Sequence, residues 1–235
     1  MGNHNHFRYF KTSPEVIRLA VMMYVRFSLS LRNAEDLLHE RDIDICHESI
    51  RYWWDRFGPL FAREIRKKWH HPIPNHSNWK WHLDEVFVKI NGETHYLWRA
   101  VDHEGEVLEA FVSKKRDRKA ALAFLKKIMK RYGRAHAIVT DRLRSYRAAM
   151  KLIGNNQVHE VGRWLNNRCE NSHLPFRRRE HSMLKFRLRQ TLQKFSAIHF
   201  SFYNHFNQEP HLTSRDNFKL QHNAAITEWR RLCAT

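Results

Sequence analysis

The chain has 235 residues, 42% of them hydrophobic, and its 42 Lys and Arg against 24 Asp and Glu give a formal net charge of +18. This length is enough for a sizeable core in one large domain or two small ones, and the charge favours a polyanionic partner through counterion release. Because no apolar run approaches the roughly 18–20 residues of a membrane-spanning helix, and the N-terminal residues form no signal peptide, we expect a nucleic-acid partner and no membrane.

The first part of the chain has the apolar spacing of amphipathic helices. Ser13-Pro14-Glu15 is a start signal, with a capping serine, a proline in the first turn and an acid near the positive end of the helix dipole. A short second helix is expected around residues 34–38. A third helix stops at Gly58-Pro59, and a fourth runs from Leu60 to Trp69.

Two short helices around a tight turn, behind a supporting helix, predict a helix-turn-helix. The third helix would bury Ile50, Trp53 and Phe57. Its outward face would read bases or grip phosphate, and the DNA-binding residues expected there are His47, Arg51, Tyr52 and Arg56. Taken alone, this segment fits a small helical bundle with a charged exterior equally well. The basicity of the chain and the acids further along it favour DNA binding.

Two prolines, Pro72 and Pro74, interrupt both helical and strand patterns and predict a linker. The expected organisation is a helical helix-turn-helix region over residues 1–69, a linker over 70–78, a catalytic core over 79–190 and a C-terminal helical extension over 191–235.

After the linker the apolar period changes to that of strands. The expected order is strands over 79–90, 94–101 and 106–113, a helix over 117–132, a strand over 135–140, a helix over 145–153, an edge strand near Val158, and helices over about 169–189 and 192–207. Asn91-Gly92 between the first two strands is a strong hairpin signal. This order is that of the ribonuclease H-like fold. We therefore predict an α/β (α+β) core with a mixed five-stranded sheet flanked by helices.

Three acids stand out in this pattern: Asp84, Asp141 and Glu170. Asp84 lies inside an apolar strand, where an unpaired buried acid costs several kcal/mol unless a metal or a cation balances it. The period of two places Glu85 on the opposite face of that strand. Asp141 ends the next strand, and Glu170 lies where a helix begins. Each acid taken alone has an ordinary structural explanation. Asp84 fits an ion-paired acid, Asp141 a helix cap and Glu170 an acid in the first turn of a helix.

Together, the three carboxylates would hold two divalent metals about 3.5–4 Å apart, a site for phosphodiester chemistry. Two other acids compete for these places. Glu180 is an alternative third ligand, but it follows three arginines and fits a charged helical face. Asp102 is an alternative first ligand, but it falls in a turn.

Three motifs together resemble transposases of the insertion-sequence-six family. They are Trp81-His82-Leu83-Asp84-Glu85, Thr140-Asp141-x-x-x-Ser145-Tyr146 and Asn166-Asn167-x-x-Glu170-x-x-His173-x-x-x-Arg177. The resemblance covers nearly the whole chain. It implies an Asp-Asp-Glu site on a ribonuclease H-like core, with Asp84, Asp141 and Glu170 as catalytic metal ligands for Mg²⁺, and with Mn²⁺ as a substitute. It also implies the element's terminal inverted repeats and target DNA as partners, and a homodimer or larger assembly.

The same resemblance implies that Arg177 and His173, on the helical face of Glu170, grip the DNA backbone. Arg142, Arg144 and Arg178 add to the expected DNA-binding set. Trp164 would stack on an unpaired base, although a core position is the preferred interpretation. The chain departs from the family in two places. Only 29 positions separate Asp141 from Glu170, and Pro210 stands where a basic residue is expected.

The sequence therefore predicts a DNA transposase that binds insertion-sequence ends and catalyses Mg²⁺-dependent strand cleavage and strand transfer in replicative transposition. One alternative is a non-catalytic DNA-binding protein, either an inactivated transposase or a regulator. Retention of all three acids disfavours it. Another is a nuclease without strand transfer, which the helix-turn-helix disfavours.

Cysteine usage bears on the compartment. Cys46, Cys169 and Cys233 are far apart and form no Cys-x-x-Cys pair, which fits a reducing cytoplasm. The resemblance to the transposase family implies that this cytoplasm is bacterial and that the protein associates with the nucleoid. The 18 histidines offer zinc ligands. Without a cysteine pair to complete a tetrahedral site, a solvated histidine-rich surface is the preferred interpretation.

Overall fold

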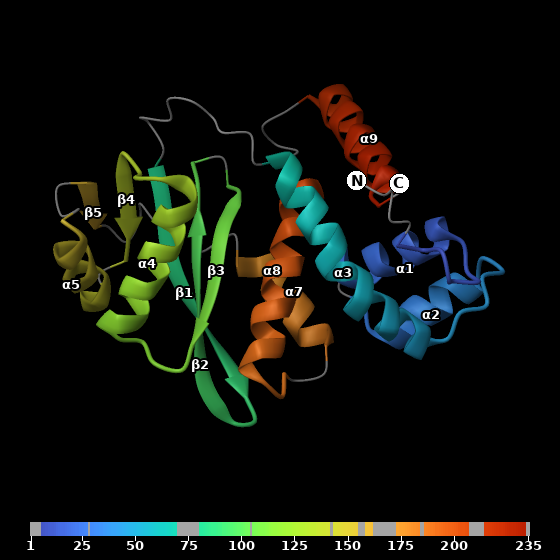
Figure 1. Ribbon diagram of the computed structural model, residues 1–235, viewed down its shortest axis with the longest axis horizontal. Helices are drawn as coiled ribbons and strands as arrows, with labels where there is room; N and C mark the ends of the chain where they lie inside the picture. Colours follow the sequence, from blue (N-terminus) through green and yellow to red (C-terminus); the bar gives the residue numbers. More distant parts are fainter. Residues whose placement is uncertain are drawn as a thin grey trace. The chain divides into compact units, whose positions relative to one another are not determined.

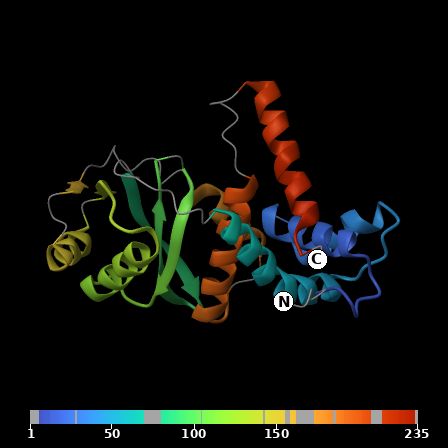
Figure 2. The same cartoon turned by 45° about the horizontal axis from the view of Figure 1, so that its top comes forward.

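The computed structural model describes residues 6–27, 29–69, 80–103, 105–141, 143–154, 158–161, 173–183, 186–206 and 214–233 (Figures 1 and 2). The chain divides into two compact units. One comprises Met1–His71 with Ile198–Thr235, and the other Pro72–Ala197. The linker predicted over residues 70–78 lies outside the described residues, and the predicted domain boundaries stay a prediction.

The first unit is helical. It contains α1 (Pro14–Arg26), α2 (Leu31–His39), α3 (His47–Trp69), the last part of α8 (Arg189–Phe206) and α9 (Arg215–Arg231). The start signal read from the sequence is confirmed, because the Ser13 side chain caps α1 by accepting a hydrogen bond from the Val16 N–H. Ser30 caps α2 in the same way, accepting from the N–H of Asn33 at 3.0 Å.

The helix α3 continues through Gly58-Pro59, so the break predicted there is wrong. A proline inside a helix removes one backbone hydrogen bond and costs about 3 kcal/mol. Phe57 and Phe61 lie on either side of it and are fully buried, and burying each contributes about 1.5–3 kcal/mol. Packing on one continuous helical face therefore outweighs the local penalty.

Aromatic side chains from both ends of the sequence form the core of this unit. Phe7 stacks on Phe57 with ring centroids 4.8 Å apart. Trp229 of α9 meets Phe61 at 5.1 Å and Phe202 at 4.7 Å, both in edge-to-face geometry. The C-terminal helix is therefore held to the N-terminal region by a shared apolar cluster.

The second unit is built on a five-stranded sheet. Its strands are β1 (Lys80–Ile90), β2 (Glu93–Val101), β3 (Val107–Ser113), β4 (Ala137–Thr140) and β5 (His159–Val161), in the order β3-β2-β1-β4-β5. β1, β2 and β3 pair antiparallel, whereas β4 pairs parallel with β1 and β5 parallel with β4. Asn91 and Gly92 have φ angles of 50° and 84°, as a tight hairpin turn requires. The predicted mixed sheet and the ribonuclease H-like order are confirmed.

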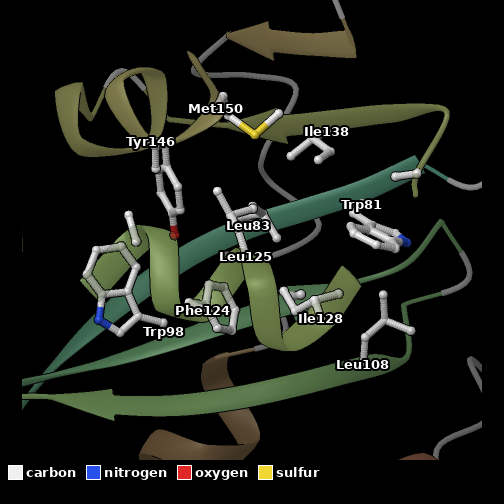
Figure 3. Packing of buried hydrophobic residues seen from close by; sticks show 14 of the residues in the cluster. Trp81, Leu83, Trp98, Leu108, Phe124, Leu125, Ile128, Ile138, Tyr146 and Met150 are labelled. Carbon is white, nitrogen blue, oxygen red and sulfur yellow. The ribbon is translucent and has the colours of Figure 1, made fainter. Parts of the chain in front are cut away.

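Helices cover both faces of this sheet (Figure 1). α4 (Arg118–Tyr132) and α5 (Arg144–Ile153) pack on one face around Trp81, Leu83 and Trp98 (Figure 3). α7 (His173–Ser182) contacts the opposite face, where Arg99 of β2 reaches His173. Because side chains alternate between the faces of a strand, neighbouring residues of β1 and β2 project into the two different layers.

Candidate active site

Two aspartates from neighbouring parallel strands meet at one point of the sheet. Leu83 of β1 is in register with Thr140 of β4, so the next residues, Asp84 and Asp141, lie side by side. Carboxylate oxygens of Asp84, Glu85 and Asp141 all lie within 4.8 Å of one another. The structure thus brings together two of the three predicted acids and adds Glu85, which was expected only on the opposite face of the strand.

Glu85 lies on the opposite face of β1 from Asp84, as the strand period predicts, yet its carboxylate still reaches the cluster. Its side chain is 1% exposed. Burial raises the pKa of Glu85 to about 7, with the nearby Arg116 opposing the shift and Asp141 and Asp84 reinforcing it. The sequence signal that could have identified Glu85 as a member of the cluster is its position next to Asp84 in an apolar strand. The alternation of side chains along the strand places it in the other layer.

Arg116, in the turn before α4, provides a positive charge for this cluster. Its guanidinium forms ion pairs with Glu85 and, at 3.6 Å, with Asp141. Burial nevertheless raises the pKa of Asp141, while the Leu143 N–H and Arg116 act in the opposite direction. Arg116 could not be singled out from the sequence, because Lys114-Lys115-Arg116 has the composition of an ordinary charged turn.

Asp84 is oriented by two hydrogen bonds. Its Oδ1 accepts from the N–H of Glu85 at 2.9 Å, and its Oδ2 lies 2.8 Å from Nε2 of His173. The other imidazole nitrogen of His173, Nδ1, lies 3.0 Å from Nη1 of Arg99. A guanidinium only donates, so Nδ1 accepts and Nε2–H donates to Asp84. Burial lowers the pKa of His173, which is consistent with a neutral ring.

His173 is 8% exposed and is hydrogen-bonded to a carboxylate of the cluster. Its expected contact with DNA stays a prediction. The third predicted acid, Glu170, lies outside the described residues, as do Arg142, Trp164 and Pro210. The competing acids have other partners. Glu180 pairs with Arg177 at 2.6 Å, and Asp102 accepts from the Glu106 N–H at 2.9 Å.

A basic pocket adjoins Asp141. Its volume is about 390 Å³, and it is lined by Asp141, Leu143, Arg144, Arg147, His159 and Val161. Arg144 belongs to the predicted DNA-binding set, whereas Arg147 was missed, although it lies three residues further along the same helix. Burial and the charge of Arg147 lower the pKa of His159. The pocket therefore presents two permanent cations next to a carboxylate of the cluster.

The other residues expected to bind DNA lie at surfaces. Arg178 on α7 is exposed, and Arg177 is partly exposed. In the helical unit, His47 pairs with Glu35 at 2.8 Å, and Arg51 with Glu48 at 3.4 Å. Tyr52 is 53% exposed and stacks on Phe10, and the guanidinium of Arg56 lies over the Phe10 ring. The fold does not test whether these residues contact DNA, so their role in DNA binding stays a prediction.

The donor set fits a divalent cation. Carboxylate oxygens are the hard ligands that Mg²⁺ and Mn²⁺ take in proteins, and the three carboxylates present them from one small region. His173 fixes one oxygen of Asp84, and hydrogen bonds of this kind commonly orient carboxylates that bind metal ions.

Much of the chain is similar to known proteins. A family model described as a DDE domain matches residues 78–209. The transposase for the insertion sequence-like element IS431mec of Staphylococcus aureus is 34% identical over 174 residues, covering 72% of this chain and 75% of the relative. The transposase for insertion sequence element IS257 in transposon Tn4003 of Staphylococcus aureus has the same identity and coverage. The chain belongs to the insertion-sequence-six family of DDE transposases.

Membership of this family confirms the predicted DNA transposase and its DDE-type enzymatic class, with divalent-metal dependence. Among solved structures, one similar chain belongs to a simian T-cell lymphotropic virus intasome in complex with PP2A regulatory subunit B56 gamma. It has a TM-score of 0.38 and 16% identity, over 80% of this chain and 61% of that one. None of the helices in the described ranges combines the length and apolar character that crossing a membrane requires.

Proposed function

We propose that this transposase binds the terminal inverted repeats of its element and cleaves and transfers DNA strands with Mg²⁺ held by Asp84, Asp141 and Glu170. The observation that carries the proposal is the parallel register of β1 and β4, which brings Asp84 and Asp141 together. Bound at these carboxylates, divalent cations supply an activated nucleophile and charge stabilisation for the leaving oxygen of an in-line displacement. Mn²⁺, with similar oxygen preferences, would replace Mg²⁺.

The chain's own residues prepare this site. His173 and Arg99 fix the direction of the Asp84 carboxylate before DNA arrives. Arg144 and Arg147 line the pocket beside Asp141. They would hold backbone phosphates of a strand that reaches the carboxylates, because a permanently charged guanidinium pairs well with phosphate. Arg177 and Arg178 of α7 would extend this contact along the strand, together with Arg142.

Recognition of the element ends is assigned to the helical unit. His47, Arg51, Tyr52 and Arg56 all lie in the first turns of α3, the position from which a recognition helix reads a major groove. Such a helix-turn-helix would direct cleavage to the specific sequences at the element ends. It would act in a dimer or larger assembly that pairs two element ends. Replicative strand transfer is the outcome proposed for such a complex.

The test is a reaction of the purified protein with its own element-end DNA and a supercoiled target, in Mg²⁺, Mn²⁺ or EDTA. Wild type runs beside Asp84→Asn, Asp141→Asn and Glu170→Gln. Asp216→Asn, which removes one exposed acid from α9, is the matched control. Joined products that require the metal, vanish in the three variants and persist in the control would support the proposal.

The non-catalytic alternative predicts a different result. End binding by wild type without cleavage or joining, in either metal, would identify a DNA-binding protein with an inactive core. Cleavage without any joined product would identify a nuclease that lacks strand transfer. Joined products that persist in the Glu170→Gln variant would remove Glu170 from the proposed site.

A further inference from the structure

An exposed aromatic side chain lies beside the acidic cluster. Phe87 is two residues beyond Glu85 on β1 and therefore projects from the same face. Its side chain is 51% exposed, whereas its neighbours Val86 and Val88 are buried. The ring meets Tyr96, its partner in the β1–β2 register, edge to face at 5.5 Å. A large apolar surface is thus left facing solvent close to the carboxylates.

Arg116 connects this ring to the acids. Its Cζ lies 5.7 Å from the centre of the Phe87 ring. The same guanidinium forms ion pairs with Glu85 and, at 3.6 Å, with Asp141. One side chain therefore spans the space from the aromatic surface to the carboxylates. A DNA strand held at Asp141 would therefore pass next to Arg116, which is also the cationic neighbour of the Phe87 ring.

A purely structural role accounts for only part of this arrangement. A cross-strand aromatic pair stabilises a hairpin, and Tyr96 also packs against the apolar core of the sheet. Phe87, in contrast, leaves half of its surface to solvent. In a chain of net charge +18, an exposed ring next to a guanidinium is the combination that binds single-stranded nucleic acid, with the ring stacking on a base and the cation near the backbone.

We propose that Phe87, together with Arg116, forms a stacking site for one unpaired nucleobase of the DNA strand that enters the acidic cluster. The site would hold the strand in register beside Asp84 and Asp141 without selecting a particular base, because every base has a π-face. The inference rests on the catalytic role proposed for these two aspartates, and it gives the substrate a defined point of contact next to them.

The test measures binding of the full-length protein to element-end DNA that carries a single-stranded flank at the cleavage position, in Ca²⁺ to prevent turnover. Wild type, Phe87→Leu and Phe87→Trp are compared on intact flanks and on flanks with one abasic nucleotide at each position in turn. Leu152→Ala, which shortens a 60% exposed apolar side chain on α5, is the control. Circular dichroism confirms that each variant is folded.

We expect one abasic position to weaken wild-type binding by about 5- to 150-fold. On intact DNA, Phe87→Leu should bind more weakly than wild type by the same factor. On the DNA with that abasic position, Phe87→Leu and wild type should bind equally, because the substitution and the missing base remove the same contact. Phe87→Trp should retain wild-type affinity, and Leu152→Ala should behave as wild type. Additive losses in Phe87→Leu, equal binding by Phe87→Leu and wild type, or a Trp variant as weak as the Leu variant would each overturn the proposal.

Asp84→Asn separates this inference from the proposed catalytic role. If the catalytic role and the stacking site are both correct, Asp84→Asn loses metal-dependent cleavage. Its DNA binding is still weakened by the same abasic position, and this effect still depends on Phe87. Cleavage that survives in Asp84→Asn would refute the catalytic assignment, whatever the binding series shows. Cleavage lost in Asp84→Asn with additive losses in the binding series would refute the stacking site alone.

Discussion

Asp84 faces Arg99 directly across the β1–β2 register, and His173 of α7 joins the two side chains by hydrogen bonds at both of its ring nitrogens. Three separate segments, β1, β2 and α7, therefore meet in one polar line inside the protein. Arg99 is fully buried, so it fixes the tautomer of His173 from a rigid position. The carboxylate at the end of this line is one of the two aspartates in the acidic cluster.

This line predicts that His173→Ala reduces metal-dependent strand cleavage by about 10- to 100-fold, the usual effect of removing a partner that orients a metal ligand. Affinity for element-end DNA should change little, because the side chain is 8% exposed. Both are measured on the purified protein, as initial cleavage rate across an Mn²⁺ titration and as end binding in EDTA.

The matched control is His181→Ala, which removes an exposed histidine from the same helix. It should leave both quantities at the wild-type level. If His173 instead gripped the DNA backbone, as the family resemblance implies, His173→Ala would lower DNA affinity and leave cleavage at saturating DNA unchanged. If His173→Ala loses DNA affinity and cleaves normally at saturating DNA, the orienting role is refuted.

Glu85 makes the metal-free protein sensitive to pH. Its folded-state pKa of about 7 lies above the ordinary glutamate value of 4.5, so the folded state binds the proton more tightly than the unfolded chain. Stability therefore falls as pH rises from about 4.5 through 7, and the loss is complete above that range. Glu85→Gln removes this loss and should be more stable than wild type at pH 8, by at most on the order of 3 kcal/mol.

Urea unfolding in EDTA at pH 5 and pH 8 measures this difference. The advantage of Glu85→Gln over wild type should be smaller at pH 5, where the wild-type carboxyl is mostly protonated in the folded state. A stability difference that is the same at both pH values would show that Glu85 is not buried with a raised pKa.

Arg116 places a positive charge where a divalent cation would also be attracted, within 3.6 Å of Asp141. Arg116→Gln should therefore raise the affinity of the DNA-free protein for Mn²⁺, by up to about tenfold. Isothermal titration calorimetry measures this constant directly. Lys115→Gln removes the same charge from the adjacent, exposed residue and should change it far less. Unchanged or weaker binding in Arg116→Gln would mean that Arg116 organises the carboxylates instead of competing with the metal.

The strands and the two aspartates could be predicted because their signals are local. An apolar run with an interior acid, a turn of Asn91-Gly92 and an acid after a short apolar strand identify β1, its hairpin and the end of β4. The ribonuclease H-like order then follows from the sequence of elements.

The partners of those acids could not be predicted in the same way. Arg99, Arg116 and Arg147 are three among 42 basic residues, and what distinguishes them is the register of β2, the path of the turn before α4 and the face of α5. Glu85 was assigned to the opposite layer correctly, but alternation does not show that a long side chain still reaches a residue at the end of the neighbouring strand. Such contacts depend on tertiary packing.

The continuous helix α3 is the clearest case of packing that overrides a local signal, and it gives a prediction about stability. Pro59 lies inside α3, where it supplies no N–H for the helix and crowds the carbonyl four residues earlier. Pro59→Ala should stabilise the protein by about 1–2 kcal/mol, because the gain of up to about 3 kcal/mol in the helix exceeds the 0.4–1 kcal/mol that proline saves by restricting the unfolded chain. Urea unfolding of wild type and variant measures the change.

Gly58→Ala is the instructive comparison at the neighbouring position. A β-carbon there would lie 3.3 Å from the Trp54 ring and 3.6 Å from Ile198, so crowding opposes the gain of about 1 kcal/mol in helix propensity. Its stability gain should therefore be smaller than that of Pro59→Ala. If Pro59→Ala destabilises the protein while Gly58→Ala stabilises it, then α3 depends on the local geometry that the proline imposes, and the buried face from Phe57 to Ile65 does not by itself keep the helix continuous.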